Sequence, residues 1–136
     1  MCCSVLRTVI NEYESFMKGI GTDIVEVDRV ASKIEKGQGF RELVFTPLEI
    51  AYCEKQVNKY ESYAARFAAK EAFLKALGTG YGGSGIHFNE IEIRNNPAGK
   101  PELFLTGNAA PQMEGLNVLL SMSHVKAVAM ATVVIF

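Results

Sequence analysis

The stretch YAARFAAKEAFLKALGTG, residues 63–80, decides how the rest of the chain is arranged. Nearly every residue in it is a strong helix former, and Gly78 stands where a C-cap glycine belongs. Apolar side chains recur at spacings of three and four residues, which predicts a packed face. We therefore predict a long helix that ends at Gly78 and packs against the other elements.

Four charged side chains lie among the alanines of this helix. Glu71 and Lys75 are four residues apart and therefore point the same way, and Arg66 and Lys70 repeat that spacing on a neighbouring strip. The simplest interpretation is exposed ion pairs, each stabilising the helix by about 0.2–0.5 kcal/mol. The alanines favour another interpretation, because small side chains let a second element approach closely. A carboxylate and an ammonium held in such a crevice suit a metal ion and an anion.

Length, charge and cysteine content limit the class of protein. The 136 residues fit one domain, and no apolar tract is long enough to cross a bilayer. The net charge of −1 provides no global attraction to nucleic acid or to an anionic membrane, so we expect neither as a partner. Cys2, Cys3 and Cys53 have no metal-ligand spacing, which indicates a reduced, cytoplasmic protein. Residues 1–18 make a poor signal peptide, and we interpret them as an N-terminal extension of a domain at residues 19–136.

Alternating residues predict a first strand at residues 19–27. Asp23 falls on the same face as Val25 and Val27, which is the apolar face. An acidic side chain there is unfavourable unless it is paired or bound to a cation. Asp23 is therefore expected either to bind a cation or to brace a neighbouring backbone group.

Asp28 is expected to cap a helix at residues 29–36. Arg29 and Lys33 lie four residues apart on one side of this helix. They form either a solvated face or a docking strip for an acidic partner.

The remaining elements indicate the fold class. Thr46, Pro47 and Glu49 predict the start of a helix that runs to about Val57. Strands are expected at residues 88–94, 102–106, 117–124 and 126–136. The last is almost entirely apolar, so we expect it to be central. This order predicts an α+β fold in which an antiparallel sheet packs against the long helix.

A glycine-rich segment follows the long helix at residues 78–85. Its backbone N–H groups are free to approach a phosphate, although a plain linker has the same composition. The segment is not a P-loop, because there the lysine follows the glycines and opens a helix.

These residues allow one main chemistry. Asp23 and Glu71 can converge, since a core-facing strand residue and a core-side helix residue are natural neighbours. Two carboxylates suit Mg²⁺, which takes one or two of them together with waters and substrate phosphates. With Lys75 and the glycine-rich segment alongside, the residues describe a site for a substrate that carries a diphosphate.

A hydrolase built from Ser121, Ser123, His124 and Asp23 is a weaker alternative. The sequence has no nucleophile elbow, and the adjacent Ser123 and His124 point to opposite faces of a strand.

Four stretches, in this order, resemble bacterial holo-[acyl-carrier-protein] synthase, the small trimeric class of 4′-phosphopantetheinyl transferases. They are residues 19–24 (GIGTDI), 66–80 (RFAAKEAFLKALGTG), 91–93 (IEI) with 99–101 (GKP), and 121–124 (SMSH). The resemblance covers about residues 19–135, and its helix motif is long and specific.

The resemblance implies an enzyme that moves 4′-phosphopantetheine from coenzyme A to a serine of apo-acyl carrier protein and releases adenosine 3′,5′-bisphosphate. Asp23 and Glu71 match the family's Mg²⁺ ligands, and Lys75 matches its lysine at the coenzyme A phosphates. These three residues are the expected catalytic set. Glu71 is also our candidate base for the serine hydroxyl, directly or through a water.

The family resemblance also implies how coenzyme A is held. Gly78, Thr79 and Gly80 match the segment near the nucleotide. Ser121 and His124 match residues near the coenzyme that a neighbouring subunit contributes.

Arg29 lies where the family docks the acidic recognition helix of the carrier protein, which gives the strip of Arg29 and Lys33 a use. The family is a homotrimer with active sites at its interfaces, and it lacks the N-terminal extension. Three alternatives remain: a Mg²⁺-dependent nucleotide or diphosphate hydrolase without a protein acceptor, a binding module for coenzyme A or nucleotides, and a structural trimer in which Asp23 is salt-bridged.

Overall fold

The computed structural model describes residues 17–80 and 83–136. Its strands are β1 (Gly19–Glu26), β2 (Ile91–Asn95), β3 (Pro101–Leu105), β4 (Val118–His124) and β5 (Val128–Ile135). Its helices are α2 (Val27–Glu35), α3 (Phe40–Val44), α4 (Pro47–Glu54) and α5 (Lys59–Leu77), with short 3₁₀ segments η1 (Phe88–Glu90) and η2 (Gly107–Met113). The fold is the predicted α+β class.

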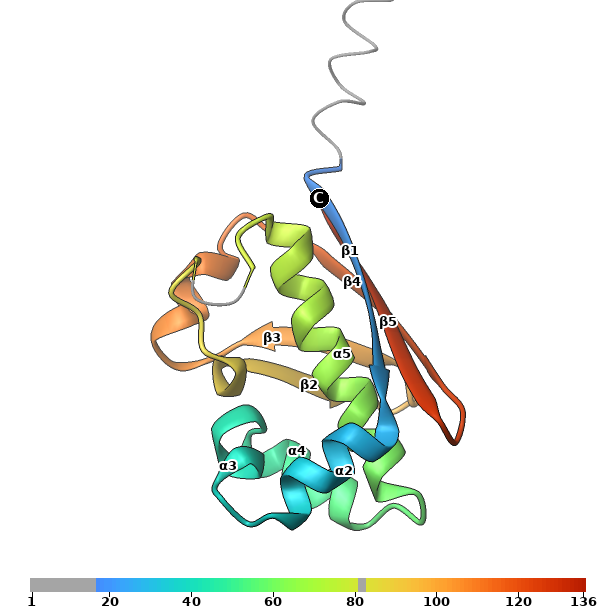
Figure 1. Cartoon of the computed structure of the whole chain (residues 1–136). Coiled ribbons are helices and arrows are strands. Elements are labelled where there is room, and N and C mark those ends of the chain that lie inside the picture. Colours follow the sequence, from blue (N-terminus) through green and yellow to red (C-terminus); the bar gives the residue numbers. More distant parts are fainter. Residues whose placement is uncertain (1–16, 81–82) are drawn as a thin grey trace, which may run out of the picture.

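The strands form two antiparallel sheets where one was expected (Figure 1). One sheet has the order β1-β5-β4, and β2 pairs with β3 in a separate hairpin. The apolar strand β5 is central, as predicted, because it pairs with both β1 and β4. Its buried residues alternate along the side that faces α5. The segment expected to begin a strand at Phe88 is instead a 3₁₀ turn that leads into β2.

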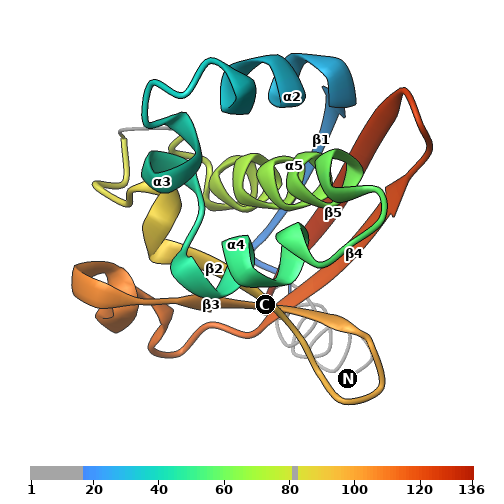
Figure 2. The same ribbon diagram turned by 90° about the horizontal axis from the view of Figure 1, so that it is seen from below.

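Helix α5 runs through the middle of the molecule, with the three-stranded sheet on one side and α3 and α4 on the other (Figure 2). It begins at Lys59, before the expected start at Tyr63. It ends at Gly78, whose φ of +80° is the left-handed conformation predicted for a C-cap glycine. Alanines at the contact with β1 let the strand and the helix approach closely.

Helices α2 and α4 differ from their predicted bounds. α2 starts at Val27, and no side chain caps it, so the prediction that Asp28 is its N-cap is wrong; Asp28 lies in the first turn. At α4 the capping box of Thr46 and Glu49 is present as predicted. α4 ends at Glu54, short of Val57.

Two cations of α5 are buried, which overturns their interpretation as exposed charges. Lys70 donates to Glu49 Oε1 at 2.6 Å, to the carbonyl of Val44 at 2.7 Å and to that of Phe88 at 2.9 Å. All three ammonium hydrogens therefore have acceptors. Arg66 is also buried; it donates to Asn95 Oδ1 at 2.7 Å and lies 4.1 Å from the centroid of the Tyr52 ring.

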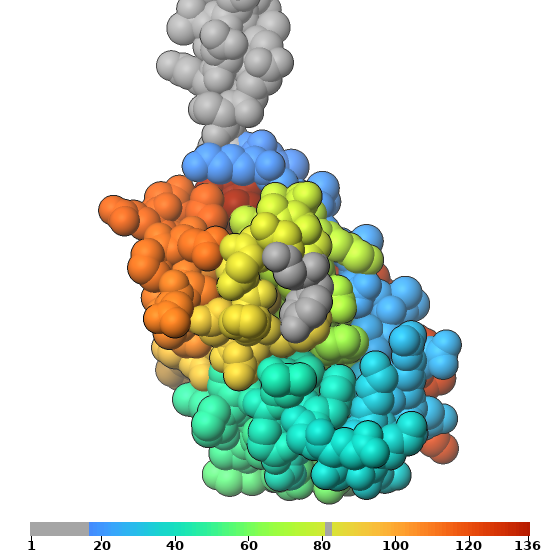
Figure 3. Space-filling model, turned by 60° about the vertical axis from the view of Figure 1, so that its left-hand side comes forward, coloured from blue at the N-terminus to red at the C-terminus, as the bar shows by residue number. Residues whose placement is uncertain are grey.

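The Lys70 contacts join α5 to segments that lie far apart in the sequence. In the space-filling view, α3 and α4 (teal) lie directly below the segment that leads into β2 (yellow) (Figure 3). Glu49 completes this connection by accepting a hydrogen bond from the backbone N–H of Ile93 at 3.1 Å. The carboxylate of Glu49 and the ammonium of Lys70 are both fully buried.

In residues 17–80 and 83–136 no helix is both long enough and apolar enough to cross a membrane. The predicted N-terminal extension, with Cys2 and Cys3, lies almost entirely outside the described residues. Cys53 is buried and unpaired, and burial raises its thiol pKa to about 12.

Candidate active site

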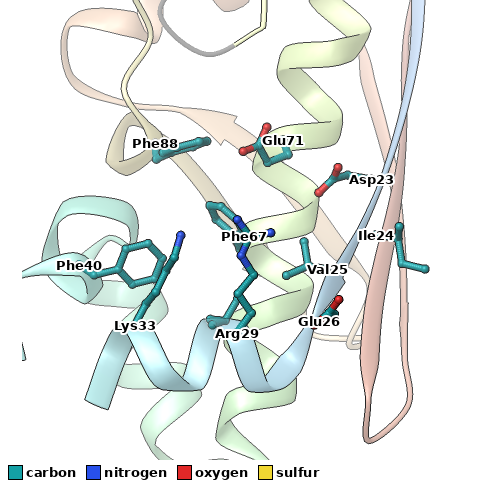
Figure 4. A pocket seen from close by; sticks show the side chains of 11 residues that line it. Asp23, Ile24, Val25, Glu26, Arg29, Lys33, Phe40, Phe67, Glu71 and Phe88 are labelled. Atoms are coloured by element: carbon teal, nitrogen blue, oxygen red, sulfur yellow. The ribbon is translucent and has the colours of Figure 1, made fainter. Parts of the chain in front are cut away.

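A pocket of about 470 Å³ lies where β1, α2 and α5 meet (Figure 4). Asp23 enters it from β1 and Glu71 from α5, while Arg29 and Lys33 reach in from α2. Asp23 and Glu71 thus line one part of the pocket, whereas Arg29 and Lys33 line another part, where Glu26 also lies. Apolar and aromatic side chains fill in the rest of the wall.

Asp23 owes its position to the alternation of side chains between the two faces of β1. Gly21, Asp23 and Val25 turn toward α5, and Ile24 turns away to the exposed face. The carboxylate of Asp23 accepts a hydrogen bond from Lys75 Nζ at 2.9 Å, and the same ammonium donates to the carbonyl of Thr22 at 3.0 Å. Lys75 is thus paired with Asp23 on β1 and not with Glu71 on its own helix.

Glu71 is half-buried, on the turn of α5 that precedes Lys75. Burial raises the pKa of its carboxyl group, and the negative charge of Asp23 raises this pKa further. The charges of Lys75 and Lys33 oppose the rise. Two carboxylates that repel each other across one pocket are stabilised by a bound cation.

The donor set fits Mg²⁺ as a cation shared with a substrate. Among the described residues no three His, Cys, Asp or Glu side chains form a cluster that would hold a metal by themselves. Mg²⁺ does not need such a cluster, because it keeps several waters and binds through one or two carboxylates plus substrate phosphates. Asp23 and Glu71 supply the two carboxylates, and the pocket leaves room for the other ligands.

The strip of Arg29 and Lys33 borders the pocket itself (Figure 4). Arg29 is exposed, and Lys33 is half-buried with its ammonium 5.3 Å from the centroid of the Phe40 ring. Because both side chains line the same pocket as the two carboxylates, an acidic partner bound to this strip would lie next to Asp23 and Glu71.

Three aromatic rings form a wall that sequence reasoning missed. Phe67 packs against Phe40 with ring centroids 6.1 Å apart and against Phe88 with centroids 5.5 Å apart. Phe67 is one of the apolar residues whose spacing predicts the packed face of the helix. Its partners come from α3 and η1, and no spacing pattern in the sequence links them to α5.

The residues expected near the coenzyme do not lie at this pocket within one chain. His124 Nδ1 is 2.9 Å from Glu61 Oε2. Glu61 precedes Glu71 by ten positions on α5, or about 15 Å along the axis. Ser121 is exposed on the face of β4 that turns away from α5. A hydrolase that joins Ser121, His124 and Asp23 is therefore not assembled within one chain.

The glycine-rich segment begins beyond the last turn of α5. Gly78 and Gly80 both have positive φ, and Thr79 between them is exposed. The segment thus leaves the helix in a conformation that favours glycine. Tyr81 and Gly82, which continue it, lie outside the described residues.

The chain is similar to proteins of known class along most of its length. Residues 19–132 match the model of the 4′-phosphopantetheinyl transferase superfamily. Holo-[acyl-carrier-protein] synthase of Cytophaga hutchinsonii is 61% identical over 90 residues, which cover 66% of this chain and 70% of that protein.

Solved structures agree with the sequence matches. The holo-[acyl-carrier-protein] synthase of Neisseria meningitidis is 38% identical, with a TM-score of 0.80 over 89% of this chain and 99% of that one. The Bacillus anthracis synthase, solved in complex with CoA (3′,5′-ADP), is 39% identical, with a TM-score of 0.73 over 88% of this chain and 96% of that one.

Fold, sequence match and structural likeness together define a transferase of the 4′-phosphopantetheinyl class, and the chain belongs to that superfamily. Within it, the chain is a member of the holo-[acyl-carrier-protein] synthase family of enzymes.

Proposed function

We propose that this enzyme transfers 4′-phosphopantetheine from coenzyme A to a serine hydroxyl of apo-acyl carrier protein in the cytoplasm. The products are holo-acyl carrier protein and adenosine 3′,5′-bisphosphate. The observation that carries the proposal is the convergence of Asp23 and Glu71 on one pocket that Arg29 and Lys33 also line. The relatives' names and the coenzyme complex of the Bacillus anthracis synthase support the same reaction.

Asp23 and Glu71 would hold Mg²⁺. When bound, Mg²⁺ neutralises charge on the diphosphate of coenzyme A and on the phosphate group that leaves. Lys75 contributes a second positive charge, because its half-exposed ammonium can turn from Asp23 toward a phosphate oxygen. Gly78, Thr79 and Gly80 follow directly and are proposed to lie near the nucleotide.

The transfer needs one proton to be removed. The serine Oγ forms a bond to the β-phosphorus of coenzyme A, and the bond from that phosphorus to the bridging oxygen breaks. The serine proton passes to the Glu71 carboxylate, directly or through a water.

Arg29 and Lys33 are proposed to dock the carrier. An acidic helix laid on this strip would bring its serine to the mouth of the pocket that contains Glu71. Charge complementarity of this kind steers encounter and fixes orientation more than it adds affinity.

A homotrimer is part of the proposal, supported by the uncovered face of the three-stranded sheet. The large apolar side chains exposed on it are Ile20, Ile24, Leu119 and Met130. Between them runs a row of hydroxyl side chains, Thr22, Thr132 and Ser121, which are aligned across the three strands. A neighbouring subunit on this face would bury the apolar side chains and bring Ser121 to an interface, as the family resemblance implies.

The test is to incubate the full chain with coenzyme A, Mg²⁺ and apo-acyl carrier protein and to measure the mass of the carrier. We expect the mass to rise by one phosphopantetheine group and the rise to require Mg²⁺. Cleavage of coenzyme A without modification of the carrier would indicate a hydrolase instead. Binding of coenzyme A without cleavage would indicate a binding module.

A further inference from the structure

Strand β1 lies against the backbone of α5 at two glycines. A Cβ atom at Gly21 would overlap the carbonyl oxygen of Ala72 and lie 2.6 Å from the backbone nitrogen of Ala76. A Cβ atom at Gly19 would overlap the carbonyl oxygen of Ala76. Since these neighbours are backbone atoms of a helix, no side-chain rotation can make room, and the strand or the helix must move.

Glycine is needed here for space and not for backbone conformation. Neither Gly19 nor Gly21 has a positive φ, so the backbone of each is accessible to alanine. Both are on the same side of β1 as Asp23, which they precede by four and two residues. The absence of side chains at these positions brings the whole strand close to the helix.

The contacts of Gly21 fall next to the functional residues. Ala72 follows Glu71 in the chain, and Ala76 follows Lys75. Gly21 thus rests on the helix backbone at the two turns that carry the carboxylate and the ammonium. The three atoms nearest to a Cβ atom at Gly19 all belong to Ala76. Gly19 is about 13 Å from Asp23 along the strand, compared with about 7 Å for Gly21.

We propose that Gly21 is a positioning residue that sets the separation between Asp23 and Glu71, and hence the affinity of the site for a divalent cation. This inference rests on the proposed Mg²⁺ site and adds the element that fixes its width. A methyl group at position 21 would push β1 outward and withdraw the Asp23 carboxylate from Glu71. The cation would then lose one of its two protein ligands.

The test is a titration of the full chain with Mn²⁺ in the presence of coenzyme A, with the free ion followed by electron paramagnetic resonance. We expect Gly21→Ala to weaken Mn²⁺ binding by about 10–100-fold, as when other supports of metal ligands are removed. Gly19→Ala is the matched control, because it meets the same kind of overlap farther from Asp23. It should lower the melting temperature similarly and weaken Mn²⁺ binding by less than about threefold, which is below that range.

A longer acidic side chain provides a rescue that a purely structural role would not produce. Asp23→Glu should weaken Mn²⁺ binding in the wild-type background and strengthen it in the Gly21→Ala background, where the strand is farther away. This reversal of sign is measured by a double-mutant cycle. If Asp23→Glu weakens binding in both backgrounds, or if the two glycine variants lose affinity equally, the proposal is wrong.

Folding is checked by circular dichroism before each titration. If Gly21→Ala is unfolded in buffer, all variants are measured with trimethylamine N-oxide, which strengthens apolar burial. If Gly21→Ala does not fold in trimethylamine N-oxide while Gly19→Ala does, Gly21 is needed for folding and the proposal is wrong. The proposed function can fail separately. If Mn²⁺ binding depends on Gly21 as expected but the wild-type chain does not modify the carrier, the proposed function is contradicted and this inference stands.

Discussion

Lys75 Nζ lies 2.9 Å from Asp23 Oδ1, so the ammonium of the long helix is paired with the strand and not with Glu71 on its own helix. The side chain of Lys75 is 52% exposed, whereas that of Asp23 is 16% exposed. The lysine is therefore the partner that can move when a phosphate arrives. Asp23, held on the inner face of β1, stays where a cation would need it.

Replacing Lys75 by methionine should impair catalysis and spare the fold. We expect kcat for transfer to fall by about 10²–10³-fold, the usual effect of removing one group that stabilises transition-state charge. An exposed ion pair contributes only about 0–1 kcal/mol, so the melting temperature should change little. Steady-state transfer and thermal unfolding measure the two effects. Lys55→Met, at the exposed end of α4, is the control and should keep its activity.

Glu71→Gln should abolish transfer while the fold persists. Loss of a general base typically slows a reaction by about 10²–10⁴-fold, and loss of a metal ligand adds to this. Mass spectrometry of the carrier measures transfer, and circular dichroism measures the fold. If Glu71→Gln keeps most of its activity with Mg²⁺ present, Glu71 is not the base.

The same substitution should change how stability depends on pH. The pKa of Glu71 is raised above its ordinary value of 4.5 by burial and by the charge of Asp23. Between the ordinary pKa and the raised one, the folded state binds more protons than the unfolded state, so the free energy of unfolding falls as pH rises. Urea unfolding with EDTA should show that the free energy of unfolding of the wild type, minus that of Glu71→Gln, falls as pH rises through this range. A parallel pH profile for the two proteins would contradict it.

How much of the site is predictable from the sequence depends on whether the signal is local. The alternation of β1 correctly placed Asp23 on the inner face, and the spacing of Glu71 and Lys75 correctly placed them one turn apart. The apolar composition of β5 correctly made it the central strand. Each of these signals is contained in a single element.

Partners from distant parts of the chain could not be predicted in this way. The exposed-pair interpretation of Arg66 and Lys70 is wrong because their partners, Asn95 and Glu49 among them, belong to other elements. Two cations four residues apart cannot neutralise each other, and that like-charge spacing was the available signal that they have other partners.

Lys70→Met should be strongly destabilising, although Lys70 lies outside the pocket. It leaves the fully buried Glu49 carboxylate without its cation, which typically costs about 3–5 kcal/mol. Lys70→Met/Glu49→Gln should recover much of this loss, because the buried charge is then gone as well. Urea unfolding measures both proteins. If Lys70→Met alone is as stable as the wild type, the ion pair of Lys70 and Glu49 is not required for stability.

The exposed apolar face of the three-stranded sheet predicts an effect on assembly. Met130 lies on β5, the central strand of this face, and is 44% exposed. Met130→Glu would bury a charge in each proposed interface and should convert a trimer into monomers. Analytical ultracentrifugation measures this, with Lys55→Glu as a charge-changing control outside the face. A wild-type chain that sediments as a monomer, or a variant that remains a trimer, would contradict the proposed interface.

Arg29→Ala should weaken binding of the carrier and spare binding of coenzyme A. Arg29 is exposed at the mouth of the pocket, and no ion pair with Asp or Glu occupies it among the described residues. Hydrogen bonds to charged groups contribute about 1.5–3 kcal/mol, so we expect at least about a tenfold loss of carrier affinity at low salt.

Salt separates this docking role from a general loss of structure. The Debye length shortens from about 10 Å at 0.1 M salt to about 3 Å at 1 M, so the difference between wild type and Arg29→Ala should shrink as salt is added. Calorimetric titrations with apo-carrier and with coenzyme A, each at low and high salt, measure both affinities. Lys55→Ala removes the same charge elsewhere and should leave both unchanged. Equal losses for carrier and coenzyme would contradict a specific role of Arg29 in docking the carrier.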